Sequence, residues 1–179
     1  MRRIISCVAA GAIVSVLAAC SSEADSNSDG KITAEEARAE MADASIKPLP
    51  GQYKMTMTFK SAKIPGAPAS MIDMMGKSMS QTMEYCLTKE EADKGFQDAL
   101  SKGQDDNCTI ERMDMDGGQV DMAMKCNDPA SGPMDIAFTG EVTPTSSDLS
   151  MKMKGKLGNQ FDADIEMTMQ QERLGDCAK

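Results

Sequence analysis

A run of oxygen-bearing residues near the start of the chain has the spacing of a calcium-binding loop. Glycine stands at position 30, where such a loop turns sharply, and Ile32 is apolar where such loops bury an aliphatic side chain. A large hard cation takes six to eight oxygens, and the last carboxylate of the loop supplies two of them. We therefore expect an EF-hand-like calcium site in residues 25–36. Its oxygen ligands would come from Asp25, Asn27, Asp29, the backbone carbonyl of Lys31, Thr33 and Glu36.

Two features separate this segment from a full EF-hand. Only four residues lie between Cys20 and Asp25, which leaves no room for an entering helix, and no second loop follows to pair with the first. Thr33 and Glu36 form a capping box, which predicts an exiting helix through Met41. A half EF-hand of this kind predicts weak affinity, with a dissociation constant on the order of 10⁻⁴–10⁻³ M. The alternative is that an acidic, serine-rich linker matches the pattern by chance.

Methionine makes up 18 of the 179 residues, and much of it recurs as Met-x-Met. On a strand, both members of such a pair point to the same face. Thioethers are soft ligands, so clustered methionines could bind Cu(I) or Ag(I). The alternative, which we favour, is that methionine fills the core as a flexible side chain in place of scarce aromatics. The five pairs are Met55/Met57, Met113/Met115, Met122/Met124, Met151/Met153 and Met167/Met169.

The side chains that most often carry out catalysis are missing. Histidine is absent, which removes the usual general base and the commonest transition-metal ligand. A nucleophile activated by histidine is therefore excluded, and the sequence does not pair two carboxylates across a cleft. We expect no enzymatic activity. The net charge of −9 disfavours nucleic acid as a partner and suits divalent cations or basic partners.

The first residues have the pattern of a lipoprotein signal peptide. Two arginines precede an apolar run at residues 4–19, which is too short to serve as a permanent membrane span. The run ends in Leu17-Ala18-Ala19-Cys20, which resembles a lipobox; an ordinary cleavage site is the alternative. We expect residues 1–19 to be removed and Cys20 to carry lipid that holds the protein on a membrane. Ser21, in place of aspartate, favours the outer membrane, facing the periplasm.

Four cysteines remain for the mature domain, and in an oxidising compartment they are expected to form two disulfides. The sequence Asp116-Gly117-Gly118 is a hairpin turn signal between two alternating segments. A three-residue loop there would place Cys108 directly opposite Cys126, near disulfide reach. Cys86 would then pair with Cys177. A shift of one residue in the turn would spoil this register.

The pattern of apolar residues predicts the elements that carry these features. Period-two alternation is typical of an antiparallel sheet wetted on one face, and a capping box at Thr88 and Glu91 predicts a helix up to Gly103. A second helix is expected over residues 68–77. The expected strands lie at 53–60, 79–86, 113–115, 120–126, 134–138, 149–153 and 165–169. The fold class is therefore α+β, mostly antiparallel β, with about seven strands in a sandwich or partly closed barrel and short helices packed on it. Residues 20–46 would form a tether and residues 47–179 the β-rich domain.

Short motifs in a fixed order are similar to one known family. They are Pro50-Gly51-Gln52-Tyr53, Ile64-Pro65-Gly66, Tyr85-Cys86-Leu87-Thr88, Gly95-Phe96, Thr143-Pro144-Thr145-Ser146-Ser147-Asp148 and Leu174-Gly175-Asp176-Cys177. From about Lys47 to Cys177 the chain resembles the domain of unknown function 3617, found in exported proteins of Gram-negative bacteria. The resemblance implies an extracytoplasmic domain with paired cysteines and no particular activity. The calcium loop lies outside the shared region.

Together these features predict a membrane-anchored, calcium-binding lipoprotein that acts as a non-enzymatic binding or structural module. One alternative is a periplasmic protein that binds Cu(I) or Ag(I) through its Met-x-Met pairs. Another is a carrier or inhibitor domain with a ligand in the concave face of the sheet. The sequence does not name the ligand or protein partner of the β-rich domain.

Overall fold

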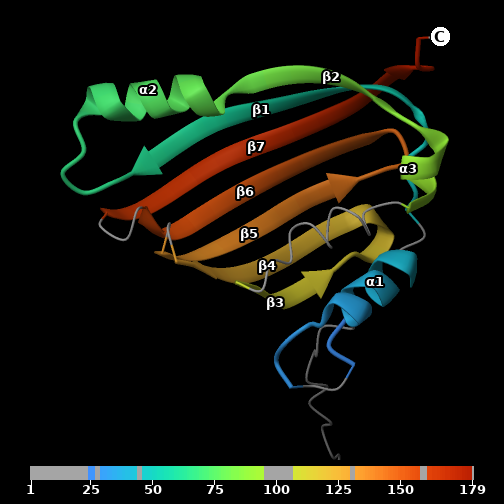
Figure 1. The fold of residues 1–179 in the computed structure, drawn as a ribbon, viewed down its shortest axis with the longest axis horizontal. Helices are drawn as coiled ribbons and strands as arrows, with labels where there is room; N and C mark the ends of the chain where they lie inside the picture. The colour runs from blue at the N-terminus through green and yellow to red at the C-terminus, as the bar shows by residue number, and fades with distance from the viewer. Residues whose placement is uncertain are drawn as a thin grey trace, which may run out of the picture.

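Alternating apolar and polar residues form seven strands, each antiparallel to its neighbours, in the computed structural model of this chain. The structure describes residues 24–26, 29–43, 46–94, 107–129, 132–157 and 161–178. The strands lie in the order β2-β1-β7-β6-β5-β4-β3, so β3 to β7 form a meander and β7 returns to lie beside β1 (Figure 1). Their bounds are β1 Gly51–Lys63, β2 Gln81–Leu87, β3 Cys108–Asp114, β4 Gln119–Asp128, β5 Gly132–Val142, β6 Ser146–Leu157 and β7 Phe161–Gly175.

The mostly antiparallel β fold with a few short helices is confirmed. All seven strands of the described residues belong to one sheet, whose edges are β2 and β3. Because these two edges do not pair with each other, the sheet stays open and does not close into a barrel. Within the described residues, three α-helices lie beside it: α1 Ala34–Asp43, α2 Ala69–Met79 and α3 Lys89–Lys94.

The helices sit at different parts of the sheet. In Figure 1, α1 lies beside β3 at one edge, whereas α2 lies at the other side, near β1 and β2. Helix α3 begins where the sequence predicts, because the Thr88 N–H donates to Glu91 Oε2 (2.9 Å) and the Glu91 N–H donates to Thr88 Oγ1 (3.2 Å). The predicted continuation of α3 to Gly103 falls outside the described residues.

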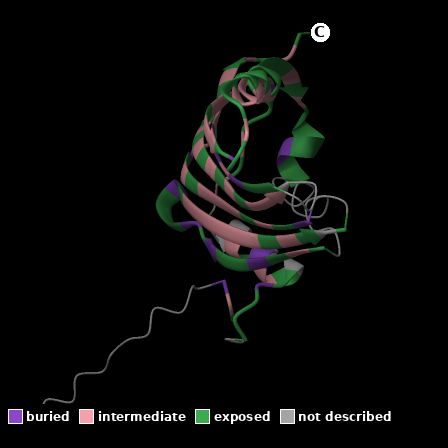
Figure 2. Ribbon diagram, turned by 90° about the vertical axis from the view of Figure 1, so that its left-hand side faces the viewer, coloured by how far each residue is buried: buried purple, intermediate pink, exposed green. Residues whose placement is uncertain are grey.

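One face of the sheet carries two apolar clusters, which contain most of the buried apolar residues of the described chain. Figure 2 marks buried positions in purple among half-buried and exposed ones. The first cluster lies at the β3 edge and contains Ala24, Ile32, Ala37, Ile110, Met113, Met115 and Val142. The second cluster contains Ile64, Ala163, Ile165 and Met167, and helix α2 packs on it through Ile72, Met75 and Met79. The core is therefore divided between the two ends of a long sheet.

The Cys108–Cys126 disulfide is formed, but by a different route from the predicted turn. Near the turn, Asp114 faces Asp121, which is one residue out of the register that a three-residue loop would set. A β-bulge at Glu111 inserts one extra residue into β3 and shifts the register back. Cys108 then lies directly opposite Cys126. The turn prediction was wrong by one residue, and the bulge restored the cysteine pair.

The second disulfide joins Cys86 of edge strand β2 to Cys177, just beyond β7. This is the remaining pair that the sequence predicts. Because β1 lies between β2 and β7, the bond fastens an edge strand to the chain's C-terminal strand across the intervening strand.

Candidate functional site

The predicted calcium loop folds around the carboxylate of its first residue. Asp25 accepts hydrogen bonds from the backbone N–H groups of Asp29, at 3.2 Å, and Gly30, at 2.9 Å. Gly30 has a φ of 79°, in the left-handed region that glycine adopts without steric cost. The N–H of Lys31 then donates to Asp29 Oδ1 at 2.9 Å. Local side-chain hydrogen bonds therefore hold the turn that the glycine permits.

The carboxylate of Glu36 connects the end of the loop to its beginning. Its Oε2 accepts hydrogen bonds from the N–H and the hydroxyl of Thr33, both at 2.9 Å. The Glu36 N–H donates to Thr33 Oγ1 at 3.2 Å, which completes a capping box. Its Oε1 accepts a hydrogen bond from the Ser26 hydroxyl at 2.6 Å. The Ser26 hydrogen bond, followed by those from Thr33, lowers the pKa of Glu36 to about 2. Glu36 is therefore an anion at neutral pH.

The donors of the predicted site suit a hard cation, but their carboxylates do not yet surround one point. The described donors are all oxygens: those of Asp25, Asp29, Thr33 and Glu36, and the carbonyl of Lys31. In the part of the chain that the structure describes, no group of three or more Asp, Glu, Cys or His side chains is placed to hold a metal ion. Asn27, the remaining predicted ligand, lies outside that part. Coordination of an ion by this set would need the carboxylates to turn from their present hydrogen bonds toward a common centre.

The loop does not stand apart from the sheet. Ile32 lies in an isolated antiparallel bridge with Ile110 of β3, and its N–H donates to the Ile110 carbonyl at 2.9 Å. Both side chains are almost completely buried, with 3% and 2% of their surface exposed. Helix α1 adds a contact through Glu40, whose carboxylate accepts a hydrogen bond from the Met115 N–H at 3.3 Å. The segment that the sequence predicts as a tether thus contributes to the first apolar cluster.

The methionine pairs mostly pack in the two clusters. Met113, Met115 and Met167 are buried, and Met122, Met57, Met151 and Met153 pack against the clusters as partly buried side chains. Cross-strand register places Met57 opposite Met169 and Met151 opposite Met167. Met115 follows the end of β3 instead of lying on it. Met55 and Met124 are half-buried residues of β1 and β4.

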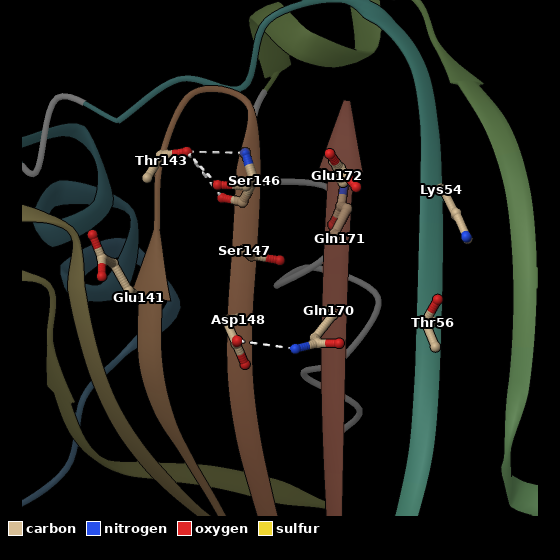
Figure 3. Close-up of a pocket in the computed structure, with 10 residues that line it drawn as sticks. All are labelled: Lys54, Thr56, Glu141, Thr143, Ser146, Ser147, Asp148, Gln170, Gln171 and Glu172. Atoms are coloured by element: carbon tan, nitrogen blue, oxygen red, sulfur yellow. Dashed lines mark hydrogen bonds between the residues drawn. The ribbon is translucent and has the colours of Figure 1, made fainter. Parts of the chain in front are cut away.

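A hollow of about 550 Å³ lies on the face of the sheet opposite the apolar clusters (Figure 3). Strand pairing builds one wall as a row in which Glu141 faces Asp148, Asp148 faces Gln170 and Gln170 faces Thr56. The Gln170 amide donates to Asp148 Oδ2 at 3.1 Å. The row therefore crosses four neighbouring strands, β5, β6, β7 and β1.

A second row of the same hollow places Ser146 opposite Glu172 and Glu172 opposite Lys54. Its lining carries three carboxylates and one amine, so the hollow is polar and negatively charged. Sequence reasoning missed this feature. Alternation identifies these residues as the polar face of their strands, but only the strand order brings residues more than a hundred positions apart into one row.

The predicted lipidation site, Cys20, lies outside the described residues. No helix in the described ranges is both long enough and apolar enough to cross a membrane.

Comparison with known proteins places most of this chain in one family. Residues 48–177 match the family described as "Protein of unknown function (DUF3617)", which covers the whole seven-stranded sheet and both disulfides. No curated protein and no solved structure matches the chain. The predicted calcium loop and helix α1 precede the matched region, as the sequence motifs imply. This chain therefore belongs to the DUF3617 family of proteins of unknown function.

Proposed function

We propose that this protein is a lipid-anchored, calcium-binding module of the periplasm with no catalytic activity of its own. The observation that carries the proposal is the approach of the two ends of the loop. Asp25 would be the first ligand of the loop and Glu36 the last. The hydroxyl of Ser26, the residue next to Asp25, donates a hydrogen bond to Glu36 and so brings the two ends of the loop together. An ion held between these ends would have oxygen donors on both sides, as calcium requires.

The proposed anchor agrees with the sequence and with the pattern of cysteines. Two disulfides are typical of a domain that folds in an oxidising compartment. Four peptide steps separate Cys20 from Ala24, which among the described residues is the first one buried in the core. Fully extended, four residues span at most about 14 Å. A lipid on Cys20 would therefore hold the β3 edge of the domain close to the bilayer surface.

Isothermal titration of the full mature protein, purified with its anchor in detergent, tests the calcium site. We expect binding of calcium with a dissociation constant on the order of 10⁻⁴–10⁻³ M, and weaker binding of magnesium. Glu36→Gln should weaken calcium binding about tenfold or more, because the loop loses a charged bidentate ligand. Glutamine also serves in a capping box, so α1 should still form.

The matched control is Glu35→Gln. Glu35 precedes Glu36, its side chain is exposed, and it is not a predicted ligand, so the variant removes the same charge without removing a ligand. It should change calcium affinity much less than Glu36→Gln. A titration without calcium-specific heat, or equal losses in the two variants, would overturn the proposal.

Of the alternatives, the carrier reading has one observation in its favour, the hollow on the polar face. Because Glu141, Asp148 and Glu172 outnumber Lys54 there, a ligand of this hollow would be small, polar and neutral or cationic. The soft-metal reading has less support, since burial of Met113 and Met167 is what core packing requires.

A further inference from the structure

The outer edge of β3 pairs with one residue of the N-terminal segment, Ile32. β3 is an edge strand, paired along its inner side with β4. An exposed edge offers unpaired backbone groups that can recruit other strands. Here the backbone of Ile32, in the middle of the proposed calcium loop, bonds to Ile110 on that outer edge. The loop therefore covers part of the sheet's edge.

Three buried residues fasten this segment to the sheet. Ala24, Ile32 and Ala37 are 4%, 3% and 0% exposed, and all three belong to the cluster that contains Ile110 and Met113. They lie before the loop, within the loop and in the first turn of α1. Docking of the segment thus depends on the relative positions of these three buried residues.

Each of these buried residues is a chain neighbour of a proposed calcium ligand. Ala24 precedes Asp25, and Ala37 follows Glu36. Ile32 stands between Lys31, which would offer its carbonyl, and Thr33, which would offer its hydroxyl. An ion that fixes the ligands must also fix the spacing of the three buried residues, because one covalent backbone carries both sets.

We propose that calcium binding in the loop and docking of Ala24, Ile32 and helix α1 at the β3 edge form one coupled equilibrium, so that calcium controls access to this edge of the sheet. This inference rests on the proposed calcium function. Coupling is reciprocal: if the ion strengthens docking, docking must strengthen ion binding by the same factor. Ile32 and helix α1 then act as a calcium-dependent cover of the edge strand.

Hydrogen exchange of the full mature protein, followed by mass spectrometry with calcium and with a chelator, tests the coupling. At a calcium concentration ten times the dissociation constant, a ligand that binds the docked state alone reduces the undocked population about elevenfold. Peptides from β3 and from residues 31–37 should therefore exchange about tenfold more slowly. Peptides from β1 and β7 around Met57 and Met167 should show no such change, because they lie in the other cluster.

Ile32→Ala provides the reciprocal test, because it shortens a buried side chain and alters no proposed oxygen ligand. Calcium affinity should fall, and the calcium protection of β3 should shrink with it. Met167→Ala is the matched control: it opens a comparable gap in the second cluster and should leave both quantities unchanged.

The outcomes separate the two proposals. If calorimetry finds no calcium binding, the proposed function fails and the coupling fails with it. If calcium binds but β3 exchanges equally fast with calcium and with chelator, the proposed function stands and the coupling is overturned. Loss of calcium affinity in Met167→Ala equal to that in Ile32→Ala would also overturn it.

Discussion

At the scale of single residues, the two tyrosines pack together and form hydrogen bonds at one end of the sheet. The chain has two tyrosines and no tryptophan. Tyr53 is 1% exposed, stacks on Tyr85 with ring centroids 5.9 Å apart, and donates its hydroxyl to the Leu49 carbonyl at 2.7 Å. Tyr85 in turn accepts a hydrogen bond from the Gln171 amide. Burial raises the pKa of both phenols, and the neighbouring Tyr53 raises the pKa of Tyr85 further.

This arrangement predicts how the protein responds to alkali. A phenol whose pKa is raised in the folded state favours its neutral form there, so its contribution to stability is complete below its unfolded pKa of 10. That contribution is lost as the pH rises through the folded value. Phenolate absorbance should therefore appear only above pH 10, together with loss of structure by circular dichroism. Tyr85→Phe would leave Tyr53 as the sole signal. Titration of either phenol at its ordinary pKa in the folded protein would contradict the packing described here.

At the scale of elements, the sheet depends on positions where two strands approach too closely for a side chain. Gly140 of β5 has a φ of 151°, and a Cβ added there would meet the backbone carbonyl of Asp148 on β6. Gly117, in the 3-10 turn Asp116–Gly118, also has a positive φ, 57°, but a Cβ there would meet nothing within 4 Å. Gly140 is thus required both for the close approach of β6 and for its backbone conformation, whereas Gly117 is required for backbone conformation alone.

The comparison of these glycines is a direct test of the β5–β6 pairing. Gly140→Ala should lower the free energy of unfolding by about 3 kcal/mol, because a backbone carbonyl cannot move aside as a flexible side chain can. Gly117→Ala should cost roughly 1–2 kcal/mol, the strain of a left-handed residue alone. Urea denaturation at constant pH measures both. Equal costs would mean that β5 and β6 are not as close at Gly140 as the structure has them.

At the scale of the whole molecule, the disulfides and the N-terminal segment hold the edges of an open sheet. One bond fastens β2 to the end of the chain, and the other joins β3 to β4. An open sheet of this length has two edges to protect, and Ile32 together with helix α1 covers part of the β3 edge.

The two disulfides should contribute unequally to stability. Cys86 and Cys177 are separated by 91 positions, whereas Cys108 and Cys126 are separated by 18. A cross-link that closes a longer loop removes more entropy from the unfolded chain, by about 4–5 kcal/mol for the first bond and about 3 kcal/mol for the second. Replacing each pair by serines and measuring urea denaturation gives the order. A larger loss for the Cys108/Cys126 variant would show that native contacts at the β3 edge outweigh chain entropy.

Local sequence determined most of the elements. Period-two alternation located most of the strands, because a half-buried strand must place apolar side chains on one face. It marked only the end of β3, which was expected at 113–115 and spans Cys108–Asp114. Capping boxes located the starts of α1 and α3, since Thr33 with Glu36 and Thr88 with Glu91 bond within a single turn. The turn of the loop at Gly30 also followed from residues close in the chain. The Cys108–Cys126 pair was predicted from a turn register that is one residue out in the structure, and Cys86–Cys177 was predicted only as the remaining pair.

Only the tertiary structure decided how these elements meet. The bulge at Glu111 corrects a turn register that the hairpin signal alone misplaced, and no local pattern marks it. The row from Glu141 to Thr56 and the bridge between Ile32 and Ile110 each join strands or segments that are far apart in the sequence. Hydrogen-bonding capacity is the same along every strand, so strand order depends on how the apolar faces and helices pack together. That packing is a property of the whole chain, and no single segment contains it.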